Sequence, residues 1–443
     1  MIETDAASAH HHLTDPLAVP MAHGPVSGSV SLPGSKSISN RVLPMAALAR
    51  GRSVLDGVLD SDDTRHMLVA LQALGFDAEA DWTTARVTID GRGGTIPASS
   101  ADLFLGNSGT SVRFLTALVA LGSGDFRIDG TPRMRQRPLA PLVDGLRGLG
   151  VSITHEGTPG NPPLVVHGQG LPGGTIRMRG DLSSQYFSAL AMVAPYATER
   201  LTIEVDGTLV SQPYLDMTAA TMRDFGVELQ RDGYERFWTE PQQTYAARDY
   251  LIEPDASAAS YFFALAAVTG GSITVERLGR NSIQGDMDFI AVLTQMGCTV
   301  SQTDSTTTVT GPATLRGIDV DMNAISDTMQ TLAAIAPFAD GPVTVRNVEH
   351  IRGKETDRVS ACVTEMRRMG ITVEERADGL TITPGTPQPA TIQTYDDHRM
   401  AMSFALTGVR ASGIRIADPA CVAKTVPTFW SLLFPLLGAA APG

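Results

Sequence analysis

The chain has 443 residues, enough for two to four domains. It is 43% hydrophobic and 18% charged, which excludes disordered, fibrous and coiled-coil proteins. A net charge of −13 argues against a nucleic-acid-binding protein, because phosphate contacts need a basic face.

The hydrophobic stretches are far shorter than the roughly 20 residues of a membrane span, and no signal peptide is visible at the N-terminus. The three cysteines, Cys298, Cys362 and Cys421, lie far apart without a CxxC pair. This spacing argues against a structural zinc site and is typical of a reducing compartment. We therefore expect a soluble, cytoplasmic protein.

A repeated pattern runs along the whole chain. A polar residue of the N-cap type precedes an apolar helix rich in small residues six times, at intervals of 70 to 74 residues. These starts are Ser35, Asn107, Asp181, Asp255, Ser326 and Asp396. The helices carry Ala, Leu and Met on nearly all faces, which predicts that they are buried.

Each repeat continues with a strand, a second helix and further alternating strands, so the unit is predicted to be β-α-β-α-β-β. The second helix ends at a glycine, where a left-handed C-cap is expected. These glycines are Gly75, Gly150, Gly226, Gly297, Gly370 and Gly438. The polar stretch 239–250 is the linker candidate from composition alone. It predicts two domains of three units that face each other across a cleft.

Reactive side chains concentrate in the loops before the helices. The loops before the first helices carry Lys36, Ser37, Arg41, Asn107, Gly109, Thr110, Arg113, Ser183, Ser184, Gln185, Asp327, Asp396, Asp397, His398 and Arg399. Those before the second helices carry Arg133, Arg135, Arg137, Ser211, Tyr214, Arg352, Lys354, Glu355, Arg358 and Lys424. Helix N-termini have free N–H groups and a partial positive charge, so such loops favour anions.

Lysine is scarce, and its positions coincide with these loops. Only three of the 34 Lys and Arg residues are lysines: Lys36, Lys354 and Lys424. Chance is one interpretation; the other is a requirement for a compact, mobile point charge. Together the loops predict a basic pocket that holds a doubly anionic ligand within an acidic protein.

Each motif alone has a simpler explanation. GSKS lacks the spacing of a P-loop, NSGTS could be an ordinary N-cap turn, and Glu355 could simply pair with Arg358 at i,i+3. DDHR could be a capped helix start with a surface histidine, and no second ligand cluster supports a metal site there. Their joint placement in equivalent loops favours a functional site.

Nine motifs in order, PGSKSISNR, NSGT, RMRQRP, DLSSQ, SQPY, SDTMQT, KETDR, DDHRMAM and AKTVP, resemble the 5-enolpyruvylshikimate-3-phosphate synthases of the shikimate pathway. The resemblance implies the two-domain enolpyruvyl transferase fold, an inside-out α/β barrel with three units per domain and the active site in the interdomain cleft. It implies one domain at 35–253 and a discontinuous one at 1–34 and 254–443. The hinges would lie near Gly34 and Pro254.

The implied reaction transfers the enolpyruvyl group of phosphoenolpyruvate to the 5-hydroxyl of shikimate 3-phosphate through a tetrahedral intermediate, without metal or organic cofactor. Asp327 would take the hydroxyl proton, Glu355 would protonate the methylene, and Lys36 would lie where both substrates meet. How these three share the acid and base roles stays open. We expect a monomer that acts on small anions, not on nucleic acid or membrane.

The resemblance also assigns ligands. Shikimate 3-phosphate would contact Lys36, Ser37, Arg41, Ser183, Ser184, Gln185, Ser211, Tyr214, Asp327, His350 and Lys354. Phosphoenolpyruvate would contact Lys36, Asn107, Gly109, Arg137, Gln185, Arg358, Asp397, His398, Arg399 and Lys424. His350 stands where some relatives carry Asn, and the segment before about Pro25 lies outside the resemblance.

The absent side chain at Gly109 would leave room for glyphosate, a competitor of phosphoenolpyruvate in this family, so we expect a glyphosate-sensitive enzyme. The nearest enzymatic alternative is a UDP-N-acetylglucosamine enolpyruvyl transferase, which typically has a cysteine in the loop that here reads TPRMRQRP. A non-catalytic repeat scaffold would explain six units. It would not explain why carboxylates and lysines gather at helix starts.

Overall fold

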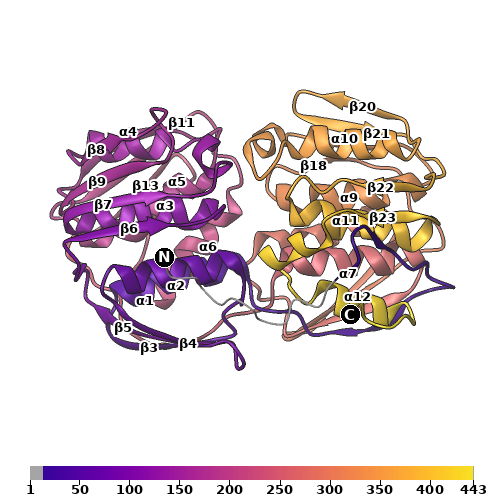
Figure 1. Cartoon of the computed structure of the whole chain (residues 1–443), viewed down its shortest axis with the longest axis horizontal. Coiled ribbons are helices and arrows are strands. Elements are labelled where there is room, and N and C mark those ends of the chain that lie inside the picture. The colour runs from indigo at the N-terminus through magenta and orange to yellow at the C-terminus, as the bar shows by residue number, and fades with distance from the viewer. Residues whose placement is uncertain (1–12, 443) are drawn as a thin grey trace.

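The structure is a computed structural model that describes residues 13–442, and it forms two lobes side by side (Figure 1). Each lobe has its own hydrophobic core. One core contains side chains from residues 38–252, and the other contains side chains from residues 17–32 and 256–437. We call these lobes the first body and the second body. Among the described residues, none of the helices has the length and hydropathy needed to cross a bilayer.

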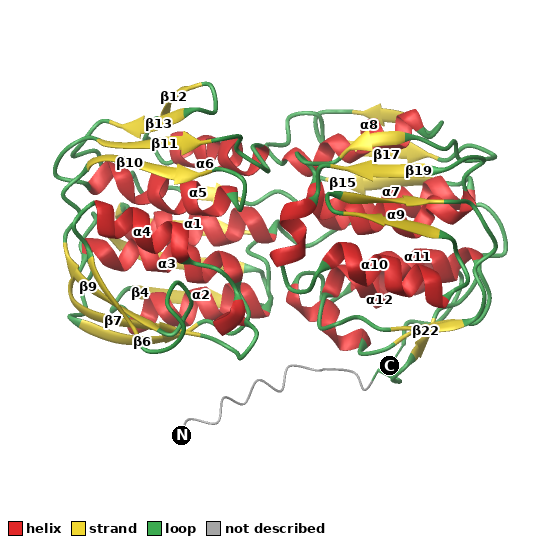
Figure 2. Ribbon diagram, turned by 90° about the horizontal axis from the view of Figure 1, so that it is seen from above, coloured by secondary structure: helices red, strands yellow, loops and turns green. Residues whose placement is uncertain are grey.

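The prediction of six buried helices is confirmed. Every residue of α7 is buried, and helices lie inside each lobe with strands on the outer faces (Figure 2). The six helices are α1 (Lys36–Leu48), α3 (Gly109–Leu118), α5 (Ser184–Val193), α7 (Ala256–Thr269), α9 (Met329–Ile335) and α11 (His398–Arg410). This arrangement is the inside-out α/β fold that the resemblance implied.

Several helix starts differ from the prediction by one to three residues. Ser35 and Asp255 are N-caps as expected, but Ser108, Ser183 and Asp397 cap α3, α5 and α11. In each case the side chain that accepts a hydrogen bond from the first turn decides where the helix begins. Helix α9 begins after the 3-10 turn η5 (Ser326–Thr328), without a side-chain cap.

The second helix of each unit ends before a left-handed glycine, as predicted. The φ angles of the six glycines are +86° at Gly75, +88° at Gly150, +86° at Gly226, +102° at Gly297, +75° at Gly370 and +72° at Gly438. Glycine adopts this conformation without the clash of a Cβ, so it ends a helix sharply. The helices are α2 (Asp62–Ala73), α4 (Ala140–Gly148), α6 (Pro213–Asp224), α8 (Phe289–Gln295), α10 (Arg358–Arg368) and α12 (Phe429–Leu436).

Three sheets cover the helices of the first body. Each has one parallel pair followed by antiparallel neighbours. Their strand orders are β14 (Asp249–Leu251), β3 (Arg50–Asp56), β5 (Arg86–Arg92), β4 (Asp77–Asp81); β6 (Ser100–Phe104), β7 (Ser123–Asp129), β9 (Leu164–Gln169), β8 (Ser152–His155); and β10 (Gly174–Arg179), β11 (Leu201–Asp206), β13 (Arg236–Thr239), β12 (Gln230–Asp232).

The sheets of the second body follow the same plan, except that the sixth unit has three strands. Their orders are β2 (Ser27–Val30), β15 (Ser272–Glu276), β17 (Thr306–Thr310), β16 (Thr299–Gln302); β18 (Asp319–Asp321), β19 (Val343–Arg346), β21 (Gly379–Ile382), β20 (Val373–Arg376); and β22 (Ala390–Ile392), β23 (Ile414–Ile416), β1 (Leu17–Ala18).

The two bodies exchange a strand where the chain crosses between them. Strand β2 precedes α1 in the chain but pairs in parallel with β15 of the fourth unit. Strand β14 precedes α7 but pairs in parallel with β3 of the first unit. The two crossings lie against each other, since Gly34 bridges to Pro254 and the Ser35 amide donates to the Glu253 carbonyl at 2.8 Å.

The linker predicted from composition at 239–250 is wrong. Tyr245, in its middle, is fully buried in the first core and donates its hydroxyl to the Met192 carbonyl at 2.8 Å. The stretch looks polar because many of its side chains are exposed, including Glu240, Gln242 and Arg248, while its backbone leads into β14. The segment before Pro25 also belongs to the fold from Leu13 onward, whereas the histidines at 10–12 lie outside the described residues.

Candidate active site

A small cavity of about 30 Å³ lies where the two bodies meet. Side chains of both bodies line it: Lys36, Ser37, Thr110, Ser183, Ser184, Gln185, Ser211, Tyr214, Asp327, His350 and Lys354. With the exception of Arg41, these include every residue that the resemblance assigns to shikimate 3-phosphate. Two regions far apart in the sequence therefore form one site.

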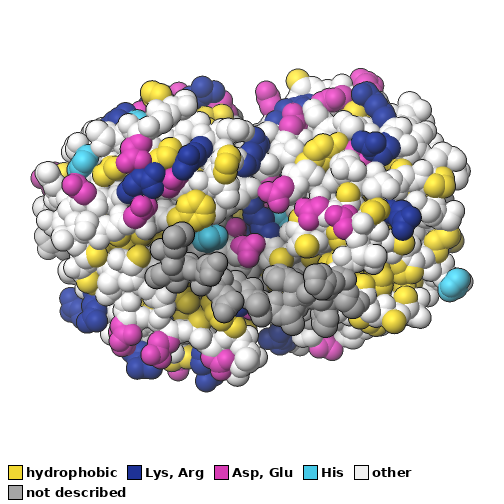
Figure 3. All heavy atoms as spheres, viewed as in Figure 1, with side chains coloured by type: hydrophobic (Ala, Val, Ile, Leu, Met, Phe, Trp, Pro, Cys, Tyr) yellow, Lys and Arg dark blue, Asp and Glu magenta, His cyan; other side chains and the backbone are white. Residues whose placement is uncertain are grey.

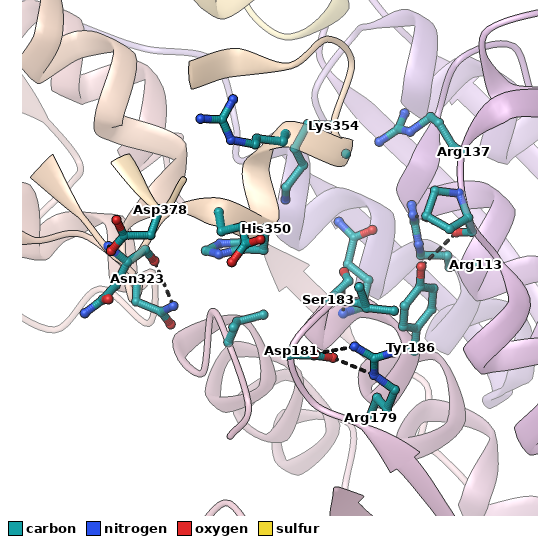
Figure 4. A pocket seen from close by; sticks show the side chains of 18 residues that line it. Arg113, Arg137, Arg179, Asp181, Ser183, Tyr186, Asn323, His350, Lys354 and Asp378 are labelled. Carbon is teal, nitrogen blue, oxygen red and sulfur yellow. Dashed lines mark hydrogen bonds and ion pairs between the residues drawn. The ribbon is translucent and has the colours of Figure 1, made fainter. Parts of the chain in front are cut away.

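A larger hollow of about 490 Å³ shares Ser183, Gln185, His350 and Lys354 with the small cavity. Figure 4 shows its walls, with His350 and Lys354 on one side and Ser183 and Arg113 on the other. In the view of Figure 3, acidic and basic side chains alternate over the surface and a notch separates the lobes. The basic groups of the site are thus a local cluster within a net acidic protein.

Helix starts position much of the site. Lys36, Gly109, Ser184, Arg358 and His398 are the first residues of α1, α3, α5, α10 and α11. Since the first N–H groups of a helix have no partner within the helix, these ends favour bound anions. The fold therefore brings helix starts from five units to one place, four of them from first helices and one, α10, from a second helix.

Asp327 is held by three cations of the second body. Its Oδ1 atom lies 2.8 Å from Arg358 Nη1 and 3.9 Å from Lys354 Nζ, and its Oδ2 atom lies 2.9 Å from Arg399 Nη2. Burial alone would raise the pKa of Asp327, but these neighbours hold it well below its usual value. Asp327 is therefore ionised in the site without ligand.

Glu355 has a similar environment on the other side of Arg358. Its Oε2 atom lies 2.7 Å from Arg358 Nη2, and its Oε1 atom lies 3.3 Å from Lys424 Nζ and 3.9 Å from Arg137 Nη1. Burial opposes ionisation, but Lys424, Arg358 and Arg137 hold the pKa of Glu355 well below its usual value. Arg358 thus bridges the two predicted catalytic carboxylates.

Asp397 and His398 support this cluster from α11. Asp397 is fully buried, accepts from Arg358 Nε at 2.8 Å and caps the helix by accepting from the Arg399 amide at 2.9 Å. His398 is also fully buried, and burial together with the charges of Lys36 and Arg399 holds its pKa well below the usual value. Its imidazole is therefore neutral.

Two buried arginines of the first body, Arg41 and Arg113, lack such carboxylate partners. Arg41 is buried and bonds to neutral oxygens, namely Thr218 Oγ1 at 2.8 Å, the Ser37 carbonyl at 2.9 Å and the Tyr214 carbonyl at 3.0 Å. Burial lowers its pKa to about 10. Among residues 13–442, no carboxylate forms an ion pair with Arg41 or Arg113 within 4.0 Å. Buried cations without a counter-ion favour an anionic ligand.

Hydroxyl and amide groups complete the site. His350 Nε2 lies 3.1 Å from Ser211 Oγ across the body boundary and 2.9 Å from Ser326 Oγ. Burial, with a contribution from Lys354, lowers the pKa of His350 to about 4, so the ring is neutral. Gln185 donates to Thr110 Oγ1 at 3.2 Å, which fixes its amide at the cavity wall.

The Asn107 carbonyl joins predicted phosphoenolpyruvate residues of both bodies. It accepts from Lys424 of the second body at 3.1 Å and from Arg137 of its own body at 3.0 Å. Gly109 lies beside them, because a Cβ built there would meet Arg137 Nη2 at 2.5 Å and Arg113 Nη1 at 2.6 Å. The structure therefore brings the whole predicted set together.

Sequence reasoning missed two acidic residues, and it named Arg133 without giving it a role. Asp63 Oδ2 lies 4.0 Å from Lys36 Nζ, and Asp286 accepts from the Tyr214 hydroxyl. Arg133 donates to the carbonyls of Lys354 and Glu355, both at 2.9 Å, and so fixes their loop. The repeat contained the signal, because the starts of the second helices of units one and four had received no assignment. Asp63 lies in the first turn of α2, and Asp286 lies in the turn just before α8.

Among residues 13–442, no group of three or more His, Cys, Asp or Glu side chains is arranged to hold a metal ion. The ligand set described above consists of cations, hydroxyls and single carboxylates, which suits anions.

Comparisons with known proteins agree with this geometry. A family model described as EPSP synthase (3-phosphoshikimate 1-carboxyvinyltransferase) matches residues 20–433. A 3-phosphoshikimate 1-carboxyvinyltransferase of Trichormus variabilis is 51% identical over 424 residues, covering 96% of this chain and all of that protein. A chloroplastic one of Brassica napus is 46% identical over 426 residues, covering 92% of this chain and 83% of that protein.

The solved structure of an EPSP synthase from Acinetobacter baumannii has a TM-score of 0.79 at 27% identity, covering 95% of this chain and 97% of that one. The match extends over both bodies and over the residues that form the site. The chain therefore belongs to the EPSP synthase (3-phosphoshikimate 1-carboxyvinyltransferase) family.

Proposed function

We propose that this protein transfers the enolpyruvyl group of phosphoenolpyruvate to the 5-hydroxyl of shikimate 3-phosphate and releases phosphate. Family membership supports the reaction. The observation that carries the proposal is that Arg358, buried at the meeting of the bodies, bonds both Asp327 at 2.8 Å and Glu355 at 2.7 Å. Addition and elimination need a base and an acid on either side of one reacting centre.

Shikimate 3-phosphate fits the cavity walls by charge and hydrogen bonding. Hydroxyls of Ser183, Ser184 and Ser211 donate to its phosphate, while Ser37 and the uncompensated Arg41 bind its carboxylate end. Gln185, Tyr214 and neutral His350 line the ring, and Lys354 and Asp327 contact its hydroxyls.

Phosphoenolpyruvate occupies the cation cluster nearby. Arg137, Arg358, Arg399 and Lys424 neutralise its carboxylate and phosphate, beside Asn107 and Gly109. Lys36 serves both ligands, and Asp397 and His398 hold α11 in place. Planar guanidinium forks suit the carboxylate, and ammonium groups suit a point shared between ligands.

The electrostatics provide the proton chemistry. Without ligand, Asp327 and Glu355 act as counter-ions for the cations and are weak bases. When substrate phosphates and carboxylates take over these cations, the pKa of each carboxyl rises. Asp327 can then accept the hydroxyl proton and Glu355 can hold a proton for the methylene, with Lys36 stabilising charge in both half-reactions.

We further propose that the two bodies act as domains, 35–253 and 1–34 with 254–443, which open and close about Gly34 and Pro254. The adjacent crossings support this motion, because both connections of the chain between the bodies lie side by side. A complete site within one chain supports a monomer. The free thiols Cys298, Cys362 and Cys421 are compatible with a cytoplasmic location.

A phosphate-release assay tests the function. Phosphate should appear with shikimate 3-phosphate plus phosphoenolpyruvate, and not with UDP-N-acetylglucosamine as acceptor. The loop at 131–138 contains no cysteine, which disfavours the UDP-sugar reaction. No turnover with the first pair, or turnover only with the UDP-sugar, would refute the proposal.

Glyphosate inhibition tests the site at Gly109. We propose that the enzyme is glyphosate-sensitive and that Gly109→Ala raises the inhibitor's half-maximal concentration about tenfold or more, since the added methyl displaces Arg137 and Arg113. The KM for phosphoenolpyruvate should rise in the same variant. An inhibition curve unchanged by the substitution contradicts this placement.

A further inference from the structure

The Tyr214 hydroxyl lies between the carboxylates of Asp286, which is buried, and Asp327, which is partly buried. Its oxygen is 3.1 Å from Asp327 Oδ2 and 3.1 Å from Asp286 Oδ2, with Asp286 Oδ1 at 3.4 Å. Tyr214 comes from α6 of the first body, Asp327 from η5, and Asp286 from the 3-10 turn η4 (Gly285–Asp288). The contact therefore crosses between the bodies at the predicted base.

The phenol has only one hydrogen for these two carboxylates. Burial and the two negative neighbours raise the pKa of Tyr214 well above its usual value, so it remains protonated. When it donates to Asp286, its oxygen lone pairs face Asp327, and when it donates to Asp327, they face Asp286. The hydroxyl orientation and the proton state of one carboxyl thus depend on the other.

The groups around Asp286 determine the pKa of its carboxyl. Ser257 on α7 donates to it, Arg399 on α11 attracts its charge, and Asp327 and the α7 cap Asp255 repel it. Burial is the largest effect, and with Asp327 it raises the pKa of Asp286 to about 6. Both proton states of Asp286 are therefore accessible near neutral pH.

We propose that Asp286 is a positioning residue that sets the proton affinity of Asp327 through the Tyr214 hydroxyl. The proposal rests on the proposed function, in which Asp327 accepts the proton of the acceptor hydroxyl. Asp286 itself touches neither substrate.

Ionised Asp286 favours proton uptake by Asp327. The Tyr214 hydrogen then turns to Asp286, and the Tyr214 oxygen accepts the hydrogen bond from Asp327 once that carboxyl has taken the substrate proton. No bond breaks within the bridge; only the hydroxyl rotates. Neutral Asp286 instead donates to the Tyr214 oxygen, which directs the Tyr214 hydrogen to Asp327 and weakens Asp327 as a base.

The kinetic test uses Asp286→Asn, which keeps the shape and mimics the neutral acid. We expect kcat to fall about tenfold above pH 7, the worth of one charge-assisted hydrogen bond, with the KM for phosphoenolpyruvate unchanged. The acidic limb of wild type, where kcat falls as pH drops through about 6, should be absent in the variant. A profile that superimposes on wild type overturns the proposal.

Asp288→Asn is the matched control, because it removes the same charge from an exposed position of the same turn. Its profile should follow wild type, and a loss equal to that of Asp286→Asn would overturn the proposal. Ser257→Ala is an independent variant should Asp286→Asn not fold. Removing the hydroxyl that stabilises ionised Asp286 should move the acidic limb to higher pH, and an unmoved limb counts against the proposal.

The bridge itself is tested in Tyr214→Phe. The fold-decrease in kcat caused by Asp286→Asn should be smaller in the Tyr214→Phe protein than in wild type, because only the through-space interaction between the carboxylates remains. An unchanged factor shows that the hydroxyl carries no coupling and overturns the proposal.

A ligand-free measurement separates this inference from the proposed function. The infrared carbonyl band of protonated carboxyls should show a group that titrates near pH 6 in wild type, is missing in Asp286→Asn and shifts to lower pH in Asp327→Asn. Absence of this coupling overturns the inference even if the enzyme turns over. Absence of turnover in wild type refutes the proposed function, while the band still reports on the coupling.

Discussion

The two bodies contribute different chemistry to the same site. The first body provides hydroxyls, an amide and the arginines Arg41 and Arg113, which have neutral partners. The second body provides Asp327 and Glu355, each ion-paired with Arg358. The first body therefore provides groups that favour an anion, whereas the second provides further cations together with the two carboxylates of the proposed proton transfer. The proposed reaction needs groups from both bodies.

The largest effect should come from the carboxylates of the second body. We expect Asp327→Asn and Glu355→Gln each to lower kcat by about 10² to 10⁴, because each removes a proton-transferring group. Steady-state phosphate release measures this loss. Glu374→Gln, on the exposed strand β20, should behave as wild type. If Asp327→Asn and Glu355→Gln keep most of the wild-type kcat, the second body does not provide the groups that transfer protons.

A smaller but still large effect should follow Lys424→Arg. The Lys424 ammonium donates to the Asn107 carbonyl of the first body at 3.1 Å and lies 3.3 Å from Glu355. The broader guanidinium does not fit between them, so we expect kcat/KM for phosphoenolpyruvate to fall about a hundredfold despite the retained charge. Arg415→Lys, at an exposed site, is the control. Near-normal kinetics of Lys424→Arg would show that this position does not require lysine.

Substitution in the first body should affect binding rather than turnover. Ser184→Ala keeps the Ser183 cap at the start of α5 but removes one proposed donor to the substrate phosphate. The KM for shikimate 3-phosphate should rise about tenfold with kcat nearly unchanged. Initial-rate kinetics with varied shikimate 3-phosphate measure both values. A fall in kcat without a change in KM would show that Ser184 contributes to turnover rather than to substrate binding.

His350 at the body boundary should give the smallest effect. Its folded pKa of about 4 lies below the ordinary 6.5, so the unfolded chain binds more protons between these values. Stability is therefore lost as pH falls from 6.5 toward 4, by about 2 kcal/mol at pH 5. His350→Asn should lack this loss in denaturant unfolding at pH 7 and pH 5. Equal pH dependence in both proteins would show that folding does not lower the pKa of His350.

Much of this fold could be predicted from local signals. The glycine after each second helix and the apolar helix of each unit are readable because a left-handed cap and a buried face each need particular residue types. The helix starts at Ser183 and Asp397 were missed by one or two residues, since several neighbours could cap. The exchange of β2 and β14 between the bodies could not be predicted without the resemblance. Each strand comes directly before a first helix in the chain, as expected for a strand of that helix's own unit, but it pairs in the other body.

The site residues that have a local sequence signal could also be predicted. The scarcity of lysine drew attention to Lys36, Lys354 and Lys424, and the KETDR motif drew attention to Glu355 and Arg358. Asp286 was not visible, because a single aspartate after a glycine resembles a turn residue. Its role depends on Tyr214, which lies 72 residues away in the chain and in the other body.

The exchanged strands also govern the order in which a growing chain can fold on the ribosome. The first body has all of its strands once Leu251 is made, so it can close early. Strand β2 leaves the ribosome before it, but must wait for β15, and β1 waits for β23 at residues 414–416. Until then these segments are unpaired edges, a known aggregation hazard. Truncation late in synthesis should therefore leave a folded first body with a loose leading segment.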